Sequence, residues 1–317
     1  MKRQSGKIKV VVIDDVRLDG VGWWRNSEPF AALDKTHGQY LEIHQATESV
    51  DVRLLRSADV VVRFRPNSKA SLEFLQLCKE LGLKVILDID DNLWKIPLGH
   101  PLFLDSLSFG RGVIDEIYSL ADAVWCSTDA LRYAVGDLGR CEIMPNAVLP
   151  EDLPEKPAEW SAAAMWRGND KQVSDLLHRD AVDWFERNND KYNWTFAGYV
   201  PDYPFKGNVT FQAKMSPLAY FLSLKKKQTN FMWKPLSVNA FNDCKSNIAW
   251  IEATMAGGTC VTNYAGKDEW QCALPDFTDD PELVRNTWEL SKEVILEHYN
   301  LLKVNEARFE SILKVLA

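Results

Sequence analysis

A lysine and a glutamate seven residues apart carry the strongest chemical signal in the sequence, at Lys245 and Glu252. The segment around them can form an α-helix that begins at Asn242 or Asp243 and ends at Gly257-Gly258. Seven residues make about two helical turns, which predicts both charges on one low face, roughly 10 Å apart. A cation in the first turn is unfavourable unless an anion binds beside it. We therefore expect Lys245 to hold a diphosphate and Glu252 a ribose; a solvated helix face is the alternative.

An acidic run stands at the end of an early predicted strand. Asp88-Ile89-Asp90-Asp91 follows the apolar residues 84–87, and ligands bind at the carboxyl ends of strands in open α/β sheets. Asp90 and Asp91 could therefore orient an acceptor hydroxyl or a donor sugar, or act as a base. Because adjacent side chains on a strand point to opposite faces, we expect at most one of them to be catalytic. The alternative is that both cap the following loop.

A glycine pair follows the first predicted strand, in Gly20-Val21-Gly22. Backbone N–H groups of glycines can approach a phosphate or a sugar closely, so we count Gly20 and Gly22 as donor-binding residues. The flanking Arg17 and Arg25 could meet the acceptor or the diphosphate, and Arg25 is counted with the acceptor. A plain loop is the alternative.

Two ring-bearing residues lie just beyond the acidic run, Trp94 and His100. An aromatic face can stack on a sugar, and a loop histidine can line a cleft, so both are predicted to bind the acceptor. An incidental loop histidine is the alternative for His100.

Short apolar runs, separated by helical patterns, predict the elements that position these residues. The runs are apolar at both parities and rich in β-branched residues, which is typical of parallel strands covered on both faces. They lie at 9–13, 58–62, 84–87, 123–126, 162–166, 194–198, 208–212, 230–233 and 259–263. Helices are predicted over 68–81, 171–187, 217–224, 243–256 and 281–317, the last with a break near Asn300. This alternation predicts a doubly wound α/β fold.

A proline-rich stretch divides the chain into two halves of similar size. Residues 149–157 contain three prolines in nine residues. We predict a linker there between two Rossmann-like domains, 1–148 and 158–317, the second ending in a helical tail. Two such domains would face each other across a cleft at the carboxyl ends of their strands.

The composition is that of a globular protein. Hydrophobic residues make up 46% and charged residues 26% of the 317, which excludes a disordered or fibrous chain. A net charge of −8 argues against binding nucleic acid or anionic lipid by bulk electrostatics. We expect no transmembrane segment, since no apolar run approaches about 18 residues. Six scattered cysteines favour neither a disulfide framework nor a zinc site, and predict a cytoplasmic protein.

Several segments of the chain resemble GT-B glycosyltransferases. Residues 241–258 are similar to their nucleotide-binding helix, in which a phosphate-binding lysine and a ribose-binding glutamate precede a glycine turn. Trp166-Arg167-Gly168 resembles the first strand end of their second domain, whose arginine meets the donor diphosphate. Further similar segments follow the family's order: Leu87–Trp94, Ala121–Thr128 with Leu131, and Ile143–Val148.

This resemblance implies an enzyme that moves a sugar from a nucleoside diphosphate sugar, such as a UDP-sugar, to a hydroxyl acceptor. Lys245, Arg167 and the helix N-terminus, with Asn242 and Ser246, would bind and neutralise the departing diphosphate. Glu252 would hold the ribose. Domain 1–148 would present the acceptor, closure about the linker would exclude water, and neither a metal nor a further cofactor would be required.

One residue departs from the family's pattern. Many retaining members have a glutamate eight residues before the ribose-binding one, where it holds the sugar hydroxyls; Cys244 stands there. The resemblance implies retention of the anomeric configuration, while the sugar must be recognised differently.

The acceptor and the class of protein leave alternatives open. The chain is compact and has 12 tryptophans, and in this it resembles phage-borne glycosyltransferases, some of which modify hydroxymethylated DNA bases. A polysaccharide, a lipid-linked glycan or a protein fits equally as the acceptor. The missing glutamate is compatible with a non-catalytic nucleotide-sugar-binding or scaffold protein. Asp88 and Asp90 could instead hold a divalent metal as in GT-A glycosyltransferases, although the second α/β half speaks against that fold. An epimerase of the GT-B fold is a further alternative.

Overall fold

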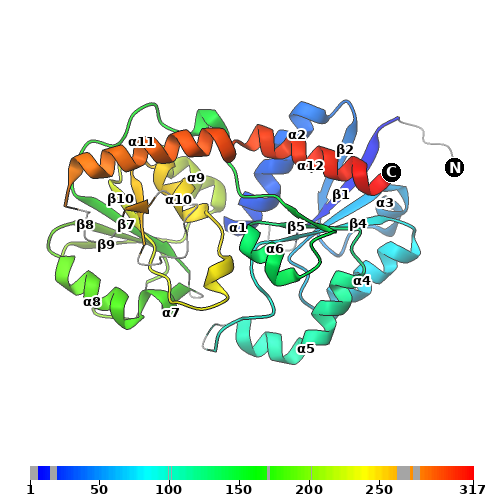
Figure 1. The fold of residues 1–317 in the computed structure, drawn as a ribbon, viewed down its shortest axis with the longest axis horizontal. Helices are drawn as coiled ribbons and strands as arrows, with labels where there is room; N and C mark the ends of the chain where they lie inside the picture. Colours follow the sequence, from blue (N-terminus) through cyan, green and yellow to red (C-terminus); the bar gives the residue numbers. More distant parts are fainter. Residues whose placement is uncertain are drawn as a thin grey trace.

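The chain folds into two α/β domains, each built on a parallel six-stranded sheet (Figure 1). The computed structural model describes residues 6–14, 20–98, 100, 102–169, 172–200, 202–262, 272–273 and 279–317. The doubly wound, two-domain architecture predicted from the alternation of strands and helices is confirmed.

The first sheet has the order β2-β1-β3-β4-β5-β6, and all its neighbouring strands are parallel. Successive residues of β1 face opposite sides: Val10 and Val12 join one core cluster, Val11 and Ile13 the other. The strand order reverses between β1 and β3, which makes their carboxyl ends a topological switch point. The strands are β1 Ile8–Ile13, β2 Leu41–Ala46, β3 Val60–Phe64, β4 Lys84–Ile89, β5 Ala123–Cys126 and β6 Cys141–Ile143.

Helices cover both faces of the first sheet. The predicted helix over 68–81 is confirmed as α4, because the Ser68 hydroxyl caps it by accepting a hydrogen bond from the Ser71 N–H (3.1 Å) and Gly82 (φ 77°) follows its end. One face carries α3 Val52–Ser57, α4 Lys69–Glu80, α5 Leu102–Ser119 and α6 Asp129–Val135. The other carries α2 Glu28–His37, which continues from α1 Gly20–Gly22 through the π-helical turn η1 Trp23–Ser27.

The second sheet repeats this plan with the order β12-β11-β10-β7-β8-β9, again all parallel. Its strand order reverses between β7 and β10, the second switch point of the molecule. All five strands predicted for this half are present. The strands are β7 Ala163–Gly168, β8 Asn193–Gly198, β9 Val209–Ala213, β10 Phe231–Trp233, β11 Thr259–Val261 and β12 Cys272–Ala273.

The second sheet is also covered on both faces. The single helix predicted over 171–187 is two helices, since the extended backbone of His178 (ψ 139°) separates them. One face carries α7 Val173–Leu176 and α8 Arg179–Asn188, and the other α9 Pro217–Leu224, α10 Ile248–Met255 and α11 Pro281–His298. Among the described residues, no helix combines the length and the apolar character that crossing a membrane requires.

The last helix, α12 Leu301–Leu316, returns to the first domain. The predicted break near Asn300 is confirmed, since its side chain caps α12 by accepting from the Leu302 N–H (3.0 Å). Figure 1 shows α11 and α12 end to end across both domains. Ile312 joins the first domain's core, and the Trp125 indole donates to the Ser311 hydroxyl (2.9 Å). Assigning all of 158–317 to the second domain is therefore wrong for this helix.

The chain crosses between the domains at two places that lie side by side. One is the proline-rich stretch, which contains a 3₁₀ turn at Pro150–Asp152; the other joins α11 to α12. The Val148 N–H donates to the Tyr299 carbonyl (3.0 Å), and the Leu301 N–H donates to the Val148 carbonyl (2.9 Å). The two crossings thus form a hydrogen-bonded pair.

Candidate active site between the two domains

A cavity of about 130 Å³ lies between the carboxyl ends of the two sheets, where ligands bind in doubly wound folds. We call it the seam cavity. The first domain lines it with Val21, Arg65, Asp91, Pro97, Leu98 and His100. The second domain lines it with Asn169, Gln172, Ser174, Asp175, Ser237, Asn239, Phe241, Asn242 and Lys245.

Lys245 reaches the seam cavity from an extended segment and not from a helix. The chain forms a 3₁₀ turn at Asn242–Cys244, extends at Lys245 (φ −59°, ψ 139°) and begins α10 only at Ile248. The helix predicted over 243–256 is therefore wrong in its first turn. Lys245 and Glu252 both face the junction of the domains, but they do not share a helix face.

Contacts to the first domain hold Cys244 out of the helix. The Thr128 hydroxyl donates to the Cys244 carbonyl (3.2 Å), and the Asn92 amide contacts its Sγ (3.5 Å). The cysteine side chain is buried in the core cluster of the first domain. The residue that stands in place of a sugar-binding glutamate therefore joins the two domains.

Lys245 is neutralised across the domain boundary by Asp91. Its Nζ lies 2.8 Å from Asp91 Oδ1 and 4.1 Å from the centre of the Phe241 ring. Arg65 Nη2 donates to the other oxygen of Asp91 at 2.8 Å. Burial alone would raise the pKa of Asp91, but Lys245 and Arg65 outweigh it and hold that pKa below its usual range. Asp91 is therefore ionised, and it occupies the cation that we predicted for a diphosphate.

Asp90 and Asp91 meet the same guanidinium. Because β4 ends at Ile89, neither belongs to the strand, and the expectation that they face opposite ways is wrong. Arg65 donates to Asp90 through Nε (2.8 Å) and Nη2 (2.6 Å). Burial raises the pKa of Asp90, Arg65 opposes this, and the neighbouring Asp91 adds to it. Asp90 is thus the more readily protonated of the pair.

Arg65 is a site residue that the sequence analysis missed. It directly follows β3, and its backbone lies in the left-handed region (φ 46°), which non-glycine residues rarely adopt. The signal was a charged residue immediately after an apolar strand, on the strand beside the acidic run.

Glu252 is almost completely buried where the two domains meet, with 1% of its surface exposed. Its Oε1 accepts from Arg167 and from the Trp24 indole N–H (3.2 Å), and its Oε2 accepts from the Tyr220 hydroxyl (3.1 Å). Trp24 belongs to the first domain, so this carboxylate links the domains as well. The Arg167 guanidinium also lies over the Tyr220 ring, 5.1 Å from its centre.

Arg167 and Lys234 leave adjacent strands at the second switch point. Trp166 of β7 pairs with Trp233 of β10, so the residues that follow them emerge side by side. Lys234 is half-buried, and no acceptor for its ammonium group is recorded among the described residues. Burial, opposed by Asp175 and assisted by the charge of Lys245, lowers the pKa of Lys234 to about 8.

Lys234 is the second residue that the sequence analysis missed. It directly follows the predicted strand 230–233 as part of Lys234-Pro235. Its place beside Arg167 depends on β10 lying next to β7, an order that local sequence does not encode.

The predicted glycine loop is helical. Gly20 opens the helical stretch 20–37, and a Cβ placed on it would stand 3.7 Å from Arg167 Nη2, so the backbone lies against that guanidinium. Gly22, two residues later, is buried. Arg17 lies outside the described residues.

The two remaining donor-site predictions differ in position. The Asn242 side chain is buried and donates to Asp175 Oδ1 (2.8 Å) and to the Ser237 carbonyl (2.8 Å), so it holds the segment that carries Lys245. Ser246 is half-buried between Lys245 and the start of α10.

Arg25 does not reach an acceptor. Its side chain is completely buried, donates from Nε to Asp88 Oδ1 (2.9 Å) and contacts the Met144 carbonyl through Nη1. The prediction that it binds the acceptor is wrong, because its charge is used to neutralise a buried carboxylate.

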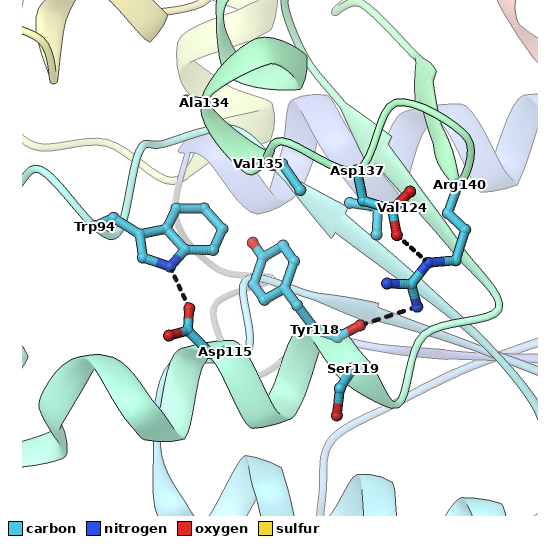
Figure 2. A pocket seen from close by; sticks show the side chains of 9 residues that line it. All are labelled: Trp94, Asp115, Tyr118, Ser119, Val124, Ala134, Val135, Asp137 and Arg140. Carbon is cyan, nitrogen blue, oxygen red and sulfur yellow. Dashed lines mark hydrogen bonds and ion pairs between the residues drawn. The ribbon is translucent and has the colours of Figure 1, made fainter.

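Of the two ring-bearing residues, only His100 lines the seam cavity. It is buried, and its ring centre lies 5.1 Å from that of Phe241 in the second domain. Trp94 turns away, and its indole N–H donates to Asp115 Oδ1 (2.9 Å) at a separate cavity of the first domain (Figure 2). Trp94 therefore does not line the seam cavity.

The fold excludes the GT-A alternative, because the chain forms two Rossmann-like domains. Its two candidate ligands are also engaged, Asp88 by Arg25 and Asp90 by Arg65. Burial, opposed by Arg25, raises the pKa of Asp88 to about 6. Within the described residues, no group of three or more histidine, cysteine, aspartate or glutamate side chains is placed to hold a metal ion.

Several solved glycosyltransferases share this arrangement of domains. Alr3699/HepE from Anabaena, in complex with UDP and glucose, superposes with a TM-score of 0.63 at 10% identity over 97% of this chain and 100% of that one. The chain adopts the GT-B fold. AviGT4, a glycosyltransferase of avilamycin A biosynthesis, gives a TM-score of 0.61 at 13% identity over 98% of both chains. The lipopolysaccharide outer core galactosyltransferase WaaB gives 0.60 at 12%, covering 97% and 99%.

Comparison of sequences adds no relative. Neither protein-family models nor curated protein sequences match the chain. The GT-B fold therefore rests on the arrangement of the backbone, and the site rests on the residues that this backbone brings together.

Proposed function

We propose that the protein is a glycosyltransferase that moves a sugar from a nucleoside diphosphate sugar, such as a UDP-sugar, to a hydroxyl acceptor. One observation carries this proposal: Arg167, Lys234 and Lys245 converge beside the switch point of the second domain in a GT-B fold. Two cations at the carboxyl end of the sheet, with a third on the segment before α10, suit a diphosphate.

Charge stabilisation is the main task of these cations in the proposed reaction. Negative charge grows on the leaving diphosphate as its bond to the sugar breaks, and preorganised cations in a water-poor site stabilise that charge. Asp91 now accepts from Lys245, so the donor must take over this lysine when it binds. The Asp91 oxygen that Lys245 leaves can then accept a hydrogen bond from the donor sugar or the acceptor hydroxyl, while Arg65 still donates to the other oxygen.

Glu252 is proposed to hold the ribose. A carboxylate has about four lone-pair sites, and three are used by Arg167, Trp24 and Tyr220. The ribose therefore needs the site that remains, or the one that Trp24 leaves when the domains move apart. Entry of the donor is thus coupled to domain opening, and closure excludes water that would hydrolyse it.

Further properties follow from the resemblance to GT-B enzymes. We propose a metal-independent transfer with retention of the anomeric configuration. The proposed acceptor is a glycan or a hydroxymethylated DNA base, and a phage origin is proposed together with the DNA acceptor. A cytoplasmic location is proposed because the five cysteines with described side chains form no disulfide and are buried: Cys78, Cys126, Cys141, Cys244 and Cys260.

The experiment is a screen of UDP-, GDP- and ADP-sugars for thermal stabilisation, followed by product analysis with the sugar that binds. A selective donor should raise the melting temperature, and transfer should release the nucleoside diphosphate. NMR of the product reads the anomeric configuration, and chelator should leave the rate unchanged. Oligosaccharides and hydroxymethylcytosine DNA serve as acceptors. Donor binding without turnover on any acceptor would support the non-catalytic alternative, and an altered free sugar would indicate an epimerase.

A further inference from the structure

A second cavity, of about 240 Å³, lies in the first domain and shares no lining residue with the seam cavity. It opens between α5, the loop after β4, and the α6–β6 connection (Figure 2). We call it the α5–α6 pocket. Its lining residues are Trp94, Asp115, Tyr118, Ser119, Val124, Ala134, Val135, Asp137 and Arg140.

Two aromatic rings form one corner of the α5–α6 pocket. The ring centres of Trp94 and Tyr118 lie 4.6 Å apart at 61°, an edge-to-face arrangement. The hydrogen bond to Asp115 (2.9 Å) fixes the orientation of the indole. Trp94 is only half-buried, so part of its surface stays open to a ligand.

The hydroxyl of Tyr118 is buried and has no hydrogen-bond partner among the described residues. Only 6% of this residue is exposed, and Figure 2 shows its ring between Trp94 and Arg140 with the hydroxyl turned toward the end of α6. Burial raises the pKa of Tyr118 well above its usual value, so the hydroxyl keeps its proton and can both donate and accept. A buried polar group without a partner is costly, and a ligand hydroxyl that reaches this group from the pocket would satisfy it.

The rim of the pocket is polar, with formal charges of −1, −1 and +1 on Asp115, Asp137 and Arg140. Arg140 Nε donates to Asp137 Oδ2 (2.6 Å), and its Nη1 donates to the Ala121 carbonyl (2.9 Å). This hydrogen bond lowers the pKa of Asp137, which is therefore ionised. The guanidinium is already paired, so the pocket offers no surplus positive charge to a phosphate or a carboxylate. A neutral ligand with several hydroxyl groups fits this chemistry.

We propose that the α5–α6 pocket binds one unit of a neutral saccharide. A pyranose has an apolar C–H face for Trp94 and a rim of hydroxyls for Tyr118, Asp115 and Asp137. The cavity is slightly smaller than pockets for drug-sized ligands, which suits a single ring. Binding there does not depend on the proposed function; only the use of the pocket to retain a glycan acceptor rests on it.

The test is a titration of the full chain with methyl glucoside, methyl galactoside and N-acetylglucosamine, in which saturation-transfer NMR measures binding. At least one sugar should bind the native protein. Tyr118→Phe should weaken that binding about fivefold to tenfold, the worth of one hydrogen bond. Ala134→Tyr, which fills the pocket from an exposed position of α6, should abolish it, while Ala130→Tyr on the same helix outside the pocket should not.

Two controls separate this inference from the donor site. Saturating UDP should leave the sugar affinity unchanged, and Lys245→Ala should lose UDP binding but keep sugar binding. Tyr118→Phe should keep or raise the melting temperature, since it removes an unpaired hydroxyl. Any of four outcomes would overturn the proposal. None of the three sugars binds, or Tyr118→Phe and Ala134→Tyr bind the sugar as tightly as the native protein does. UDP displaces the sugar, or the α5–α6 pocket binds uridine in preference to a sugar.

Discussion

The two sheet edges that face each other across the seam cavity treat their charges differently. The first domain balances its own charges, since Arg25 pairs with Asp88 and Arg65 with Asp90. In the second domain Arg167 pairs with Glu252, but Lys245 pairs with Asp91 of the other domain. Lys234 has no acceptor for its ammonium group in the part of the chain that the structure describes.

Because of this difference, an incoming anion meets paired charges at the first edge and exchangeable cations at the second. The first edge is an acidic surface on which the buried Arg25 pairs with Asp88 and the half-buried Arg65 pairs with Asp90. The second edge has cations that an incoming anion can claim, at the cost of one contact between the domains. Because the exchangeable contact is Lys245 to Asp91, the comparison can be tested one residue at a time.

Removing Lys245 should have the largest effect. Lys245→Ala should lower transfer by about a hundredfold or more, because one preorganised charge at the leaving group is lost. The checks are calorimetry with the nucleoside diphosphate and initial rates of transfer. Unchanged affinity and rate would show that the second edge does not receive the diphosphate.

Releasing Lys245 from its partner should sharpen the comparison. Asp91→Asn should bind the nucleoside diphosphate about tenfold more tightly, because the lysine no longer has to leave a carboxylate. Transfer should fall if Asp91 orients the sugar or the acceptor. The double variant with Lys245→Ala should lose the gain, and a gain that persists there would contradict an exchange on Lys245.

The pH dependence of nucleotide binding should report on Lys234. Its pKa is lowered from 10.5 to about 8, so the cation is present below pH 8 and is lost as the pH rises through 8. Affinity for the diphosphate should be constant near pH 7 and fall severalfold by pH 9. Lys234→Met should be weaker at pH 7 and lack this fall, whereas an identical profile would place Lys234 away from the ligand.

Weakening the tryptophan contact should have the smallest effect. Trp24→Phe keeps the ring but removes the N–H that donates to Glu252 across the domain boundary. Nucleotide affinity should rise about twofold to fivefold, because one neutral-to-charged hydrogen bond no longer competes with the ribose. Tyr220→Phe, which removes a contact from within the second domain, is the matched comparison. A loss of affinity in Trp24→Phe would mean that the indole itself contacts the donor.

Local patterns were sufficient for many elements of this fold, but not for all. The strands β2, β6 and β12 and the helices α2, α3, α5 and α6 were not predicted. Strands such as Val10–Ile13 are apolar at both parities, and α4 has its serine cap and its glycine stop, so nearest neighbours in sequence decide them. The break near Asn300 was also readable, since its side chain caps the next helix.

The site was harder to read because its partners are distant in sequence. The start of α10 was misplaced since Cys244 is held by Asn92, 152 residues away. Arg25 was assigned to an acceptor since nothing near it indicates Asp88, 63 residues away. Each of these contacts depends on strand order or on how the domains meet.

The paired crossings at Val148 and Asn300 have a mechanical consequence. Two hydrogen-bonded crossings resist twisting and sliding of the domains far more than a single linker does. The motion that remains is a rotation of the domains about one axis near these residues. The second domain is also attached to the first at its C-terminal end, because α12 packs against the first domain. Shortening the chain before Leu301 would thus both loosen that restriction and leave Trp125 and Phe30 without their cover.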